Sequence, residues 1–506
     1  MFMATKICSS ALVGIEAVPV EVEADISPGL PNFVVVGLPD TAVQESKERV
    51  KAAFKNSGLV FPRTRVTVNL APADIKKQGP SYDLPVATAI LEAQGAVRRA
   101  SEIGVFIGEL ALDGALRPVS GVLASAVMAR ERGFRALFVP RGNEAEAALV
   151  SGVEVYPVSS LAELVAHLKD EAVIERAICQ RSRGEHSKGS GIDFSDIAGQ
   201  NQAKRALEIA AAGGHNVLMS GPPGTGKTML ARALPTVLPE LSEEESLEIT
   251  RIKSAAGLTC VGGNLDYTRP FRSPHHTSSS VAIIGGGTWP RPGEVSLAHR
   301  GVLFLDELPE FGRSCLESLR QPLEDGFVTI SRSAGSLRFP AQFMLIGARN
   351  PCPCGHYGDS DQPCVCLPAA VDRYSRRLSG PLLDRFDLFV NVPKVRVSKV
   401  FGEKSGESSS EVRVRVESAR EVQRKRLAIL GVFTNSELTS PQIRQTVSFT
   451  DKAERRLFAS ADRLKLGARA VVRVMKVART IADLDGSEVT HENHVMEAVH
   501  FRDRKE

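Results

Sequence analysis

The segment 221–228 reads GPPGTGKT and limits the fold of this chain more than any other part of the sequence. It matches G-x-x-x-x-G-K-[ST], a glycine-rich turn whose backbone N–H groups cradle phosphate oxygens at the start of a helix. The mostly apolar run 216–220 precedes it and the helical pattern 229–234 follows it, so strand, loop and helix stand in the required order. We therefore predict a nucleotide-binding α/β core rather than a plain glycine-rich turn. The predicted nucleotide-binding residues are Gly221, Pro222, Pro223, Gly224, Thr225, Gly226, Lys227 and Thr228.

Four side chains carry the predicted phosphate chemistry. Lys227 brings a point charge to the β- and γ-phosphates, and the Thr228 hydroxyl can hold Mg²⁺. The apolar run GVLFLDE ends in Asp306 and Glu307, where the first acid would orient Mg²⁺ and the second would polarise the attacking water. A solvated strand end is the alternative for this acidic pair.

Two more positions are ambiguous from their local sequence. Asn350 ends the apolar run FMLIGARN and can contact the γ-phosphate or the attacking water, although an Asn at a strand end is usually a turn former. Arg385, in PLLDRFDL, fits either a surface ion pair or an arginine finger that reaches a neighbouring subunit's site.

Length and composition place the chain among globular proteins. Its 506 residues suggest about three domains, and 43% hydrophobic with 24% charged residues is the usual profile. A net charge of +4 excludes a strongly basic coat, and 5% aromatic residues argue against a surface of stacking rings. No run approaches the ~20 apolar residues that span a bilayer, so we expect a cytoplasmic protein without a signal peptide or membrane helix.

Composition breaks divide the sequence into four segments. Residues 1–178 alternate strand-like runs such as 18–24 with helical patterns such as 41–57, which predicts an α/β or α+β domain. Residues 179–192 are polar and rich in Gly and Ser, as linkers are. Residues 193–393 hold the α/β core. Residues 394–506 are mainly helical, and from 411 onward they carry 19 Lys and Arg against 14 Asp and Glu.

Four of the eight cysteines form the pattern CxC-x9-CxC inside a Gly/Asp-rich loop, residues 352–366. Four thiolates suit a structural, tetrahedral Zn²⁺, and reduced free thiols or a redox pair are the alternatives. His356 can replace one thiol. The predicted zinc ligands are Cys352, Cys354, Cys364 and Cys366.

Two loops are candidates for other contacts. The runs around residues 333–335 predict a β-hairpin, where Arg332 and Arg338 can contact DNA phosphates or simply face solvent. The pair His275 and His276 suggests a metal, but no carboxylate or cysteine has suitable spacing, so we favour a packed loop or pore element.

An ordered set of motifs carries a family resemblance: GPPGTGKT, PFRSPHH, GEVSLAHRGVLFLDELPEF, NPCPCG, GPLLDRFDL and VARTIADL. This set resembles the magnesium-chelatase-like AAA+ ATPases, and within them it is similar to the ComM/YifB family of bacterial competence-related proteins. The resemblance implies a P-loop AAA+ αβα core with a C-terminal helical lid, assembled as a homo-hexamer with ATP between subunits. Asn350 then matches sensor 1, Arg385 the trans arginine finger and Arg469 sensor 2, with Arg473 as second choice.

The same resemblance implies an activity. The expected protein is an ATP-driven helicase or branch-migration factor that acts on single-stranded and branched DNA, with recombination proteins as further partners. It would promote integration of single strands in natural transformation and homologous recombination. The alternatives are a magnesium-chelatase motor subunit, which works with a metal-inserting partner, and a non-catalytic AAA+ scaffold.

The N-terminal segments QGPSYDLP and GELALDGALRPV resemble the Lon-protease-like fold. Ser81 stands at the nucleophile's place, but Leu123 stands about where the dyad lysine would be, and Lys76 and Lys77 lie on the wrong side of the motif. Because leucine cannot accept a proton, we predict no protease activity and a role in ring assembly or DNA contact.

Overall fold

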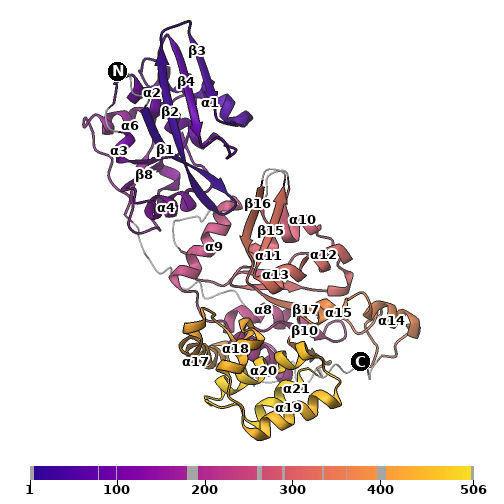
Figure 1. Cartoon of the computed structure of the whole chain (residues 1–506). Helices are drawn as coiled ribbons and strands as arrows, with labels where there is room; N and C mark the ends of the chain where they lie inside the picture. The colour runs from indigo at the N-terminus through magenta and orange to yellow at the C-terminus, as the bar shows by residue number, and fades with distance from the viewer. Residues whose placement is uncertain are drawn as a thin grey trace. The chain divides into compact units, whose positions relative to one another are not determined.

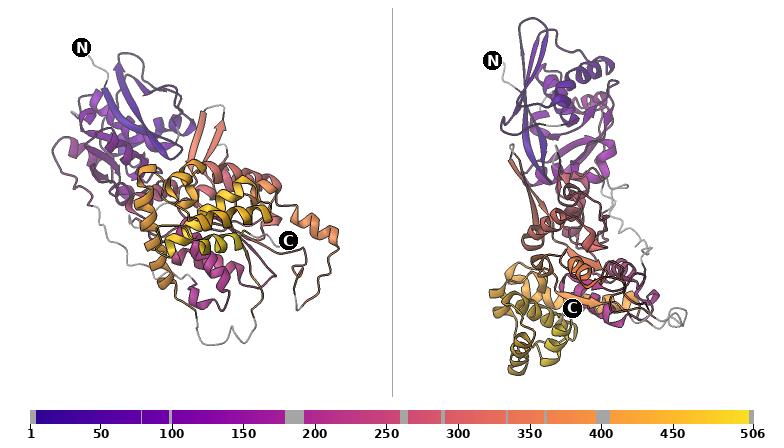
Figure 2. Two further views of the ribbon diagram at one scale, coloured as in Figure 1. Left: turned by 60° about the horizontal axis from the view of Figure 1, so that its bottom comes forward. Right: turned by 90° about the vertical axis from the view of Figure 1, so that its right-hand side faces the viewer.

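A computed structural model describes residues 5–77, 79–97, 100–178, 192–258, 265–287, 291–332, 335–359, 362–395 and 406–502. The chain forms two compact units (Figures 1 and 2). Unit 1 contains Met1–Glu185 and Glu243–Asp266, and unit 2 contains His186–Ser242 and Tyr267–Glu506. The expected linker, 179–192, lies outside the described residues except for its last position.

Unit 1 is built on a seven-stranded mixed sheet of order β3-β4-β2-β1-β5-β8-β9. The pairs β1–β2 and β2–β4 are antiparallel, and the other neighbours are parallel. In β2 the buried Val20, Val22 and Ala24 alternate with charged residues, as the sequence pattern predicts. The strands are β1 (Thr5–Val13), β2 (Glu16–Ser27), β3 (Asn32–Val36), β4 (Arg65–Ala71), β5 (Gly104–Phe106), β8 (Ala136–Pro140) and β9 (Glu154–Val158).

Helices pack against this sheet, and α2 contacts both β1 and β2. The first helix begins where the Asp40 carboxylate accepts a hydrogen bond from the Val43 N–H at 2.8 Å, a standard N-cap. The helices are α1 (Thr41–Asn56), α2 (Asp83–Ala93), α3 (Ala100–Ile103), α4 (Val122–Glu131), α5 (Glu144–Ala147) and α6 (Leu161–Leu168), with a small ribbon of β6 (Glu109–Leu110) and β7 (Leu116–Arg117).

One helix of unit 1 comes from the middle of the chain. Helix α9 (Glu243–Ala255) packs on α4, and the Ser254 hydroxyl donates to Glu146 Oε1 at 2.5 Å. The sequence places these residues within the segment 193–393, whereas the structure groups Glu243–Asp266 with the N-terminal residues.

Unit 2 contains a five-stranded sheet of order β11-β14-β17-β10-β18, in which all neighbours are parallel. This confirms the expected α/β core with a parallel sheet. Strand β10 therefore lies between β17 and β18. The strands are β10 (Val217–Ser220), β11 (Phe271–Arg272), β14 (Val302–Leu305), β17 (Met344–Arg349) and β18 (Leu388–Asn391), and the helices α7 (Asn201–Gly213) and α8 (Lys227–Val237) contact each other beside them.

Shorter elements connect these strands. Their bounds are α10 (Ser280–Ile284), β12 (Gly285–Gly286), β13 (Arg291–Pro292), α11 (Glu294–Leu297), α12 (Arg313–Ser318), α13 (Arg320–Asp325), β15 (Phe327–Arg332), β16 (Gly335–Pro340), α14 (Pro368–Ser375) and α15 (Gly380–Leu383).

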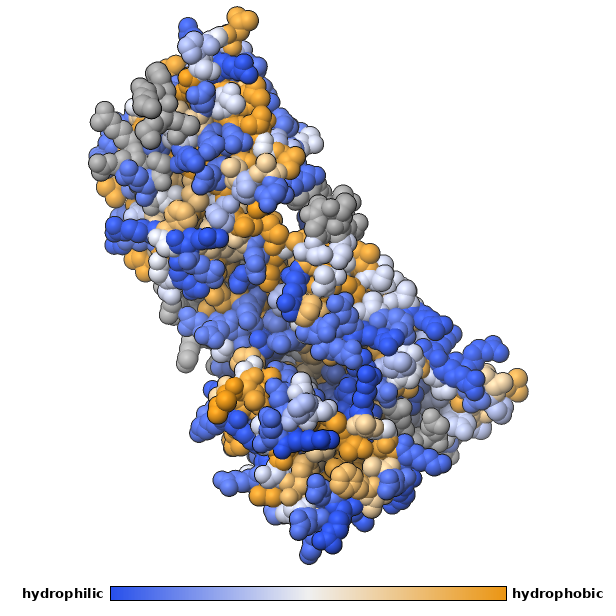
Figure 3. Space-filling view, in the orientation of Figure 1, coloured by the Kyte–Doolittle hydropathy of each residue, from blue (hydrophilic) through white to orange (hydrophobic). Residues whose placement is uncertain are grey.

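The C-terminal region is helical, as expected, and its helices gather together (Figures 1 and 2). A buried network holds it: Asp483 accepts from Arg426 at 2.6 Å, from Arg479 at 2.6 Å and from Asn435 at 2.8 Å. Apolar side chains also reach its surface (Figure 3), and Phe433 and Phe458 are more than half exposed. The helices are α17 (Ser409–Leu427), α18 (Ser440–Thr446), α19 (Asp451–Arg463), α20 (Ala468–Leu484) and α21 (Glu492–His500).

Among the described residues, no helix is both long enough and apolar enough to cross a bilayer.

In unit 1, Ser81 belongs to the short turn η1 (Pro80–Tyr82), and Leu123 is fully buried in α4. The Lon-protease-like assignment stays a prediction.

Candidate nucleotide site and cysteine cluster

The loop 221–226 connects β10 to α8, and its glycines have separate structural causes. Gly224 and Gly226 have φ values of +74° and +91°, a left-handed conformation that favours glycine. Gly221 lies so close to the neighbouring chain that an added Cβ would be 2.2 Å from the Val392 carbonyl oxygen. The Thr225 hydroxyl donates to the Pro222 carbonyl at 3.0 Å and closes the turn.

Lys227 is buried at the start of α8 and donates three hydrogen bonds. Its Nζ contacts the carbonyl oxygens of Gly221 at 2.7 Å and Pro222 at 2.8 Å, and Asn350 Oδ1 at 3.2 Å. Burial lowers the pKa of this ammonium, and the charges of Asp306 and Glu307 oppose the shift. Because an ammonium has three N–H donors, a phosphate oxygen must replace at least one of these partners.

Thr228 and Asp306 meet beside Lys227. The Thr228 hydroxyl donates to Asp306 Oδ2 at 2.7 Å, and the other carboxylate oxygen accepts from the Glu307 N–H at 2.9 Å. A hydroxyl and a carboxylate are hard oxygen ligands of the kind that Mg²⁺ prefers. These two residues therefore fit a magnesium ion.

Asn350 follows β17, and Asp306 follows β14, which is the next strand in the sheet. Parallel strands end at the same edge, so the sheet brings Lys227, Asp306 and Asn350 together. The three side chains come from parts of the sequence far from one another, and this convergence is the main feature of the site.

The carboxylate of Glu307 has a neighbour that the sequence did not suggest. His276 Nδ1 lies 3.3 Å from Glu307 Oε2, and Glu307 itself has a φ of +50°. The adjacent His275 instead contacts the Thr277 hydroxyl at 2.9 Å. Sequence spacing does not predict this pairing, because a contact between residues 276 and 307 depends on how the strands β11 and β14 align.

The three candidate arginines occupy different environments. Arg385 is buried and forms an ion pair with Glu324 of the same chain. Arg469 is exposed at the start of α20. Arg473 contacts Asp387 Oδ1 at 2.5 Å.

The acid that holds Arg473 is itself part of a buried cluster. His215 Nδ1 lies 3.4 Å from Asp387 Oδ2, and the Asn216 N–H donates to the same oxygen at 3.1 Å. Burial alone would raise the pKa of Asp387, but the charge of Arg473 and the nearby imidazole of His215 hold it well below its usual range. Arg473 therefore has a structural partner, whereas Arg469 is accessible.

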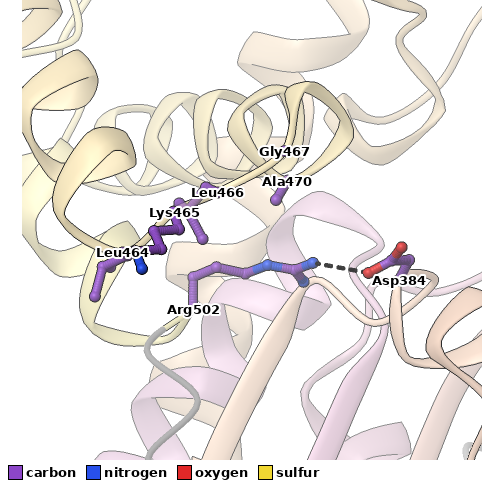
Figure 4. A pocket seen from close by; sticks show the side chains of 7 residues that line it. All are labelled: Asp384, Leu464, Lys465, Leu466, Gly467, Ala470 and Arg502. Atoms are coloured by element: carbon purple, nitrogen blue, oxygen red, sulfur yellow. Dashed lines mark ion pairs between the residues drawn. The ribbon is translucent and has the colours of Figure 1, made fainter.

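A cavity of about 320 Å³ lies near these arginines, where Arg502 points toward Asp384 with 4.0 Å between the charged atoms (Figure 4). No P-loop residue lines it, so we do not assign it to the phosphates. Its lining is Asp384, Leu464, Lys465, Leu466, Gly467, Ala470 and Arg502.

The four cysteines of the CxC pairs come together at one point. Their sulfur atoms all lie within 4.8 Å of one another, and three of the separations are 3.3, 3.6 and 3.7 Å. Sulfur ligands at about 2.3 Å from a tetrahedral Zn²⁺ lie about 3.8 Å apart, so the cluster fits that ion. His356 contacts Asp359 Oδ2 at 3.2 Å with its Nδ1 and is not part of the sulfur cluster.

The predicted hairpin forms from β15 and β16, which are antiparallel. Arg338 is exposed and places its guanidinium carbon 3.3 Å from the centre of the Phe327 ring. Arg332 ends β15, and its side chain lies outside the described residues, as do residues 333–334 at the tip.

Comparison with known proteins supplies the family. Three family models match successive parts of the chain: "Subunit ChlI of Mg-chelatase" matches residues 22–143, "Magnesium chelatase, subunit ChlI" 193–400, and "Magnesium chelatase, subunit ChlI C-terminal" 406–502. YifB of Escherichia coli is 45% identical over 97% of this chain and 96% of its own length. Competence protein ComM of Haemophilus influenzae is 42% identical over 98% and 96%. A magnesium-chelatase subunit ChlI of Olisthodiscus luteus is 29% identical over 31% of this chain and 50% of its own.

Proposed function

Because this chain belongs to the magnesium-chelatase ChlI-like family, in the group that contains YifB and ComM, we propose that it hydrolyses ATP to drive movement on DNA. The observation that carries the proposal is the convergence of Lys227, Asp306 and Asn350 at one edge of a parallel sheet. The full-length similarity to a competence protein supports DNA as the substrate.

The proposed chemistry follows from the positions of the side chains. The P-loop N–H groups and Lys227 would bind the phosphates, and Thr228 and Asp306 would hold Mg²⁺. When bound, Mg²⁺ neutralises charge on the β- and γ-phosphates. Glu307 would polarise the attacking water, and Asn350 would contact that water or the γ-phosphate.

We propose that the working form is a homo-hexameric ring. Arg385 of a neighbouring subunit would then stabilise the transition-state charge, after leaving its present partner Glu324. Arg469 is our choice for the arginine that senses the nucleotide, because it is exposed while Arg473 is held by Asp387.

The proposed substrate is single-stranded and branched DNA, and the proposed activity is helicase-type branch migration. In the cell this would extend the integration of single strands during natural transformation and homologous recombination, together with recombination proteins. Arg332 and Arg338 on the β15–β16 hairpin are the proposed phosphate contacts.

ATPase assays with and without DNA test this function. Single-stranded, duplex and branched DNA would be added to the wild-type chain and to the variants Lys227→Ala and Glu307→Gln. We expect DNA to stimulate hydrolysis in the wild type, and each variant to lose about 100-fold or more in kcat. The proposal is wrong if no DNA stimulates hydrolysis and none is bound in the presence of ATP.

The family models also favour a second candidate, a magnesium-chelatase motor subunit acting with a metal-inserting partner. The chain aligns with ComM over 98% of its length but with the ChlI relative over only 31%, which favours the DNA motor. ATPase activity that responds to a porphyrin with its partner subunits, and not to DNA, would reverse this preference.

We propose that the four clustered cysteines hold one structural Zn²⁺, which leaves no open coordination position. Metal analysis of protein purified without chelators is expected to give about one zinc per chain, and the Cys352→Ser/Cys354→Ser variant to lose it. A zinc-to-protein ratio near zero in the wild type would mean that the four cysteines are reduced free thiols or a redox pair.

We also propose that unit 1 has no peptidase activity, because the buried Leu123 stands about where the resemblance places a dyad lysine. Peptide cleavage that disappears in Ser81→Ala would overturn this proposal.

A further inference from the structure

The cysteine cluster and the P-loop touch each other. We call the segments 352–359 and 362–366, which carry the four cysteines, the cysteine knuckle. Gly355, in its first segment, has a φ of +83° and is buried against the P-loop: an added Cβ would lie 2.6 Å from Cδ of Pro223 and 3.2 Å from its Cγ. Pro223 is the third residue of the P-loop, so the knuckle backbone packs directly on the phosphate-binding turn.

The knuckle is attached on both sides of the P-loop strand. At one end it begins two residues after Asn350, which follows β17 and accepts from Lys227. On the other side of the P-loop strand, Asp359 Oδ2 of the knuckle lies 2.6 Å from Nζ of Lys394, three residues beyond the end of β18. Since β17 and β18 are the two neighbours of β10, the knuckle crosses the end of the strand that carries the P-loop.

The knuckle has few buried apolar side chains to hold it in shape, apart from its cysteines and the polar contacts of Asp359. Its described residues form turns and bends without a helix or strand, and only Cys352 and Gly355 among them are buried. Such a segment has almost no apolar core to fix it, whereas four thiolates on one cation fix a short loop outright. The Tyr357 N–H also donates to the Cys352 sulfur at 3.3 Å, as backbone groups around a metal-bound thiolate do.

We propose that the cysteine knuckle is a metal-dependent brace for the P-loop, so that zinc occupancy sets the affinity for nucleotide. With Zn²⁺ bound, the knuckle holds Pro223 and Asn350 in the arrangement that receives the phosphates. Without it, Gly355 no longer packs on Pro223 and nucleotide binding weakens. The inference rests on the proposed nucleotide and zinc sites, and it adds a coupling between them.

Two glycines of the knuckle provide a matched test that leaves the ligands in place. Gly355 and Gly358 have similar φ values, +83° and +75°, so alanine strains the backbone similarly at both positions. They differ in their surroundings: an added Cβ at Gly358 meets nothing within 4 Å. We expect Gly355→Ala to weaken binding of a fluorescent, non-hydrolysable ATP analogue about tenfold, while Gly358→Ala stays within about twofold of the wild type. Zinc content is measured on both variants and should stay near the wild-type ratio.

Coupling between two sites is reciprocal, which gives a second readout without hydrolysis or DNA. Transfer of zinc from the full-length chain to a chromogenic chelator should be slower in the presence of ADP. Lys227→Ala, which cannot bind nucleotide normally, should show no such protection. The nucleotide affinity of the zinc-stripped chain is compared with that of the zinc-loaded chain. Circular dichroism first establishes that the stripped chain is still folded.

The outcomes separate this inference from the proposed function. If zinc is bound but Gly355→Ala and Gly358→Ala bind the analogue equally well, the brace is wrong and the ATPase proposal stands. If the wild type contains no zinc, the brace is equally wrong. If the zinc-loaded wild type binds no nucleotide at all, both the brace and the proposed function are wrong.

Discussion

At the scale of single residues, the contact between His276 and Glu307 has the clearest consequence for hydrolysis. The imidazole of His276 lies 3.3 Å from the carboxylate that is proposed to polarise water, close enough to compete with that water for the carboxylate. We expect His276→Ala to raise the DNA-independent kcat by about two- to tenfold, the range that corresponds to one released hydrogen bond. Nucleotide affinity should stay the same, because the described ion pair and ring contacts of His276 are with Glu307, His275 and Phe311, outside the P-loop.

The neighbouring histidine is the control for this prediction. His275 lies in the same loop, with its ring centre 4.1 Å from that of His276, but it contacts Thr277 rather than Glu307. Steady-state assays of both variants would contradict the prediction if their kcat values changed equally, or if His276→Ala were slower than the wild type.

How far the sequence predicted the site depends on the kind of contact. Lys227, Asp306 and Asn350 could be found because each follows or ends a recognisable apolar run, and parallel strands end at one edge. The partners His276 and Lys394 could not, because loop conformation decides which side chains they meet. For the same reason the sequence did not reveal that Arg385 pairs with Glu324 in its own chain.

At the scale of elements, the β15–β16 hairpin is the candidate DNA contact. If Arg338 binds a phosphate in each subunit, Arg338→Ala should weaken binding to all DNA sequences alike. The plot of log affinity against log salt should also become shallower by about one unit for each phosphate that the variant no longer binds. Fluorescence anisotropy over a range of salt concentrations measures both effects.

A second exposed arginine serves as the comparison. Arg424, on α17, is 71% exposed in its side chain and forms a surface ion pair at 3.2 Å with Glu421 of the same helix. Arg424→Ala removes the same charge outside the hairpin. If the slope of log affinity against log salt becomes shallower by the same amount in both variants, DNA binding depends on the overall charge of the chain rather than on the hairpin.

The helical C-terminal region depends on one buried carboxylate. Asp483 on α20 pairs with Arg426 of α17 and with Arg479 of its own helix, and its side chain is fully buried. Asp483→Ala removes the carboxylate that pairs with both guanidinium groups, so we expect a loss of about 3–5 kcal/mol in the stability of this region. Hydrogen exchange of the α20 amides measures it. The exposed Asp462→Asn on α19 should change exchange little, and a similar effect of both variants would contradict the prediction.

At the scale of the whole molecule, the structure departs from the order of segments along the chain. The sequence shows no composition break at residues 243–266, so it assigns them to the segment 193–393. Their grouping with the N-terminal residues depends on tertiary contacts such as Ser254 with Glu146 and Leu247 with the apolar cluster beneath α4. Helix α8 ends at Val237 and α9 begins at Glu243, so only a short stretch of chain joins the two helices.

The proposed role of Arg385 as an arginine finger can be tested only in an assembly. We expect Lys227→Ala to inactivate a subunit's own site, and Arg385→Ala to inactivate the site of its neighbour if Arg385 acts between subunits. Mixing two inactive variants in equal amounts then restores about a quarter of the interfaces, because each interface in a head-to-tail ring takes one residue from each side. We expect ATPase activity to reappear on mixing. If Arg385 serves only the fold of its own chain, through Glu324, the mixture stays as inactive as its components.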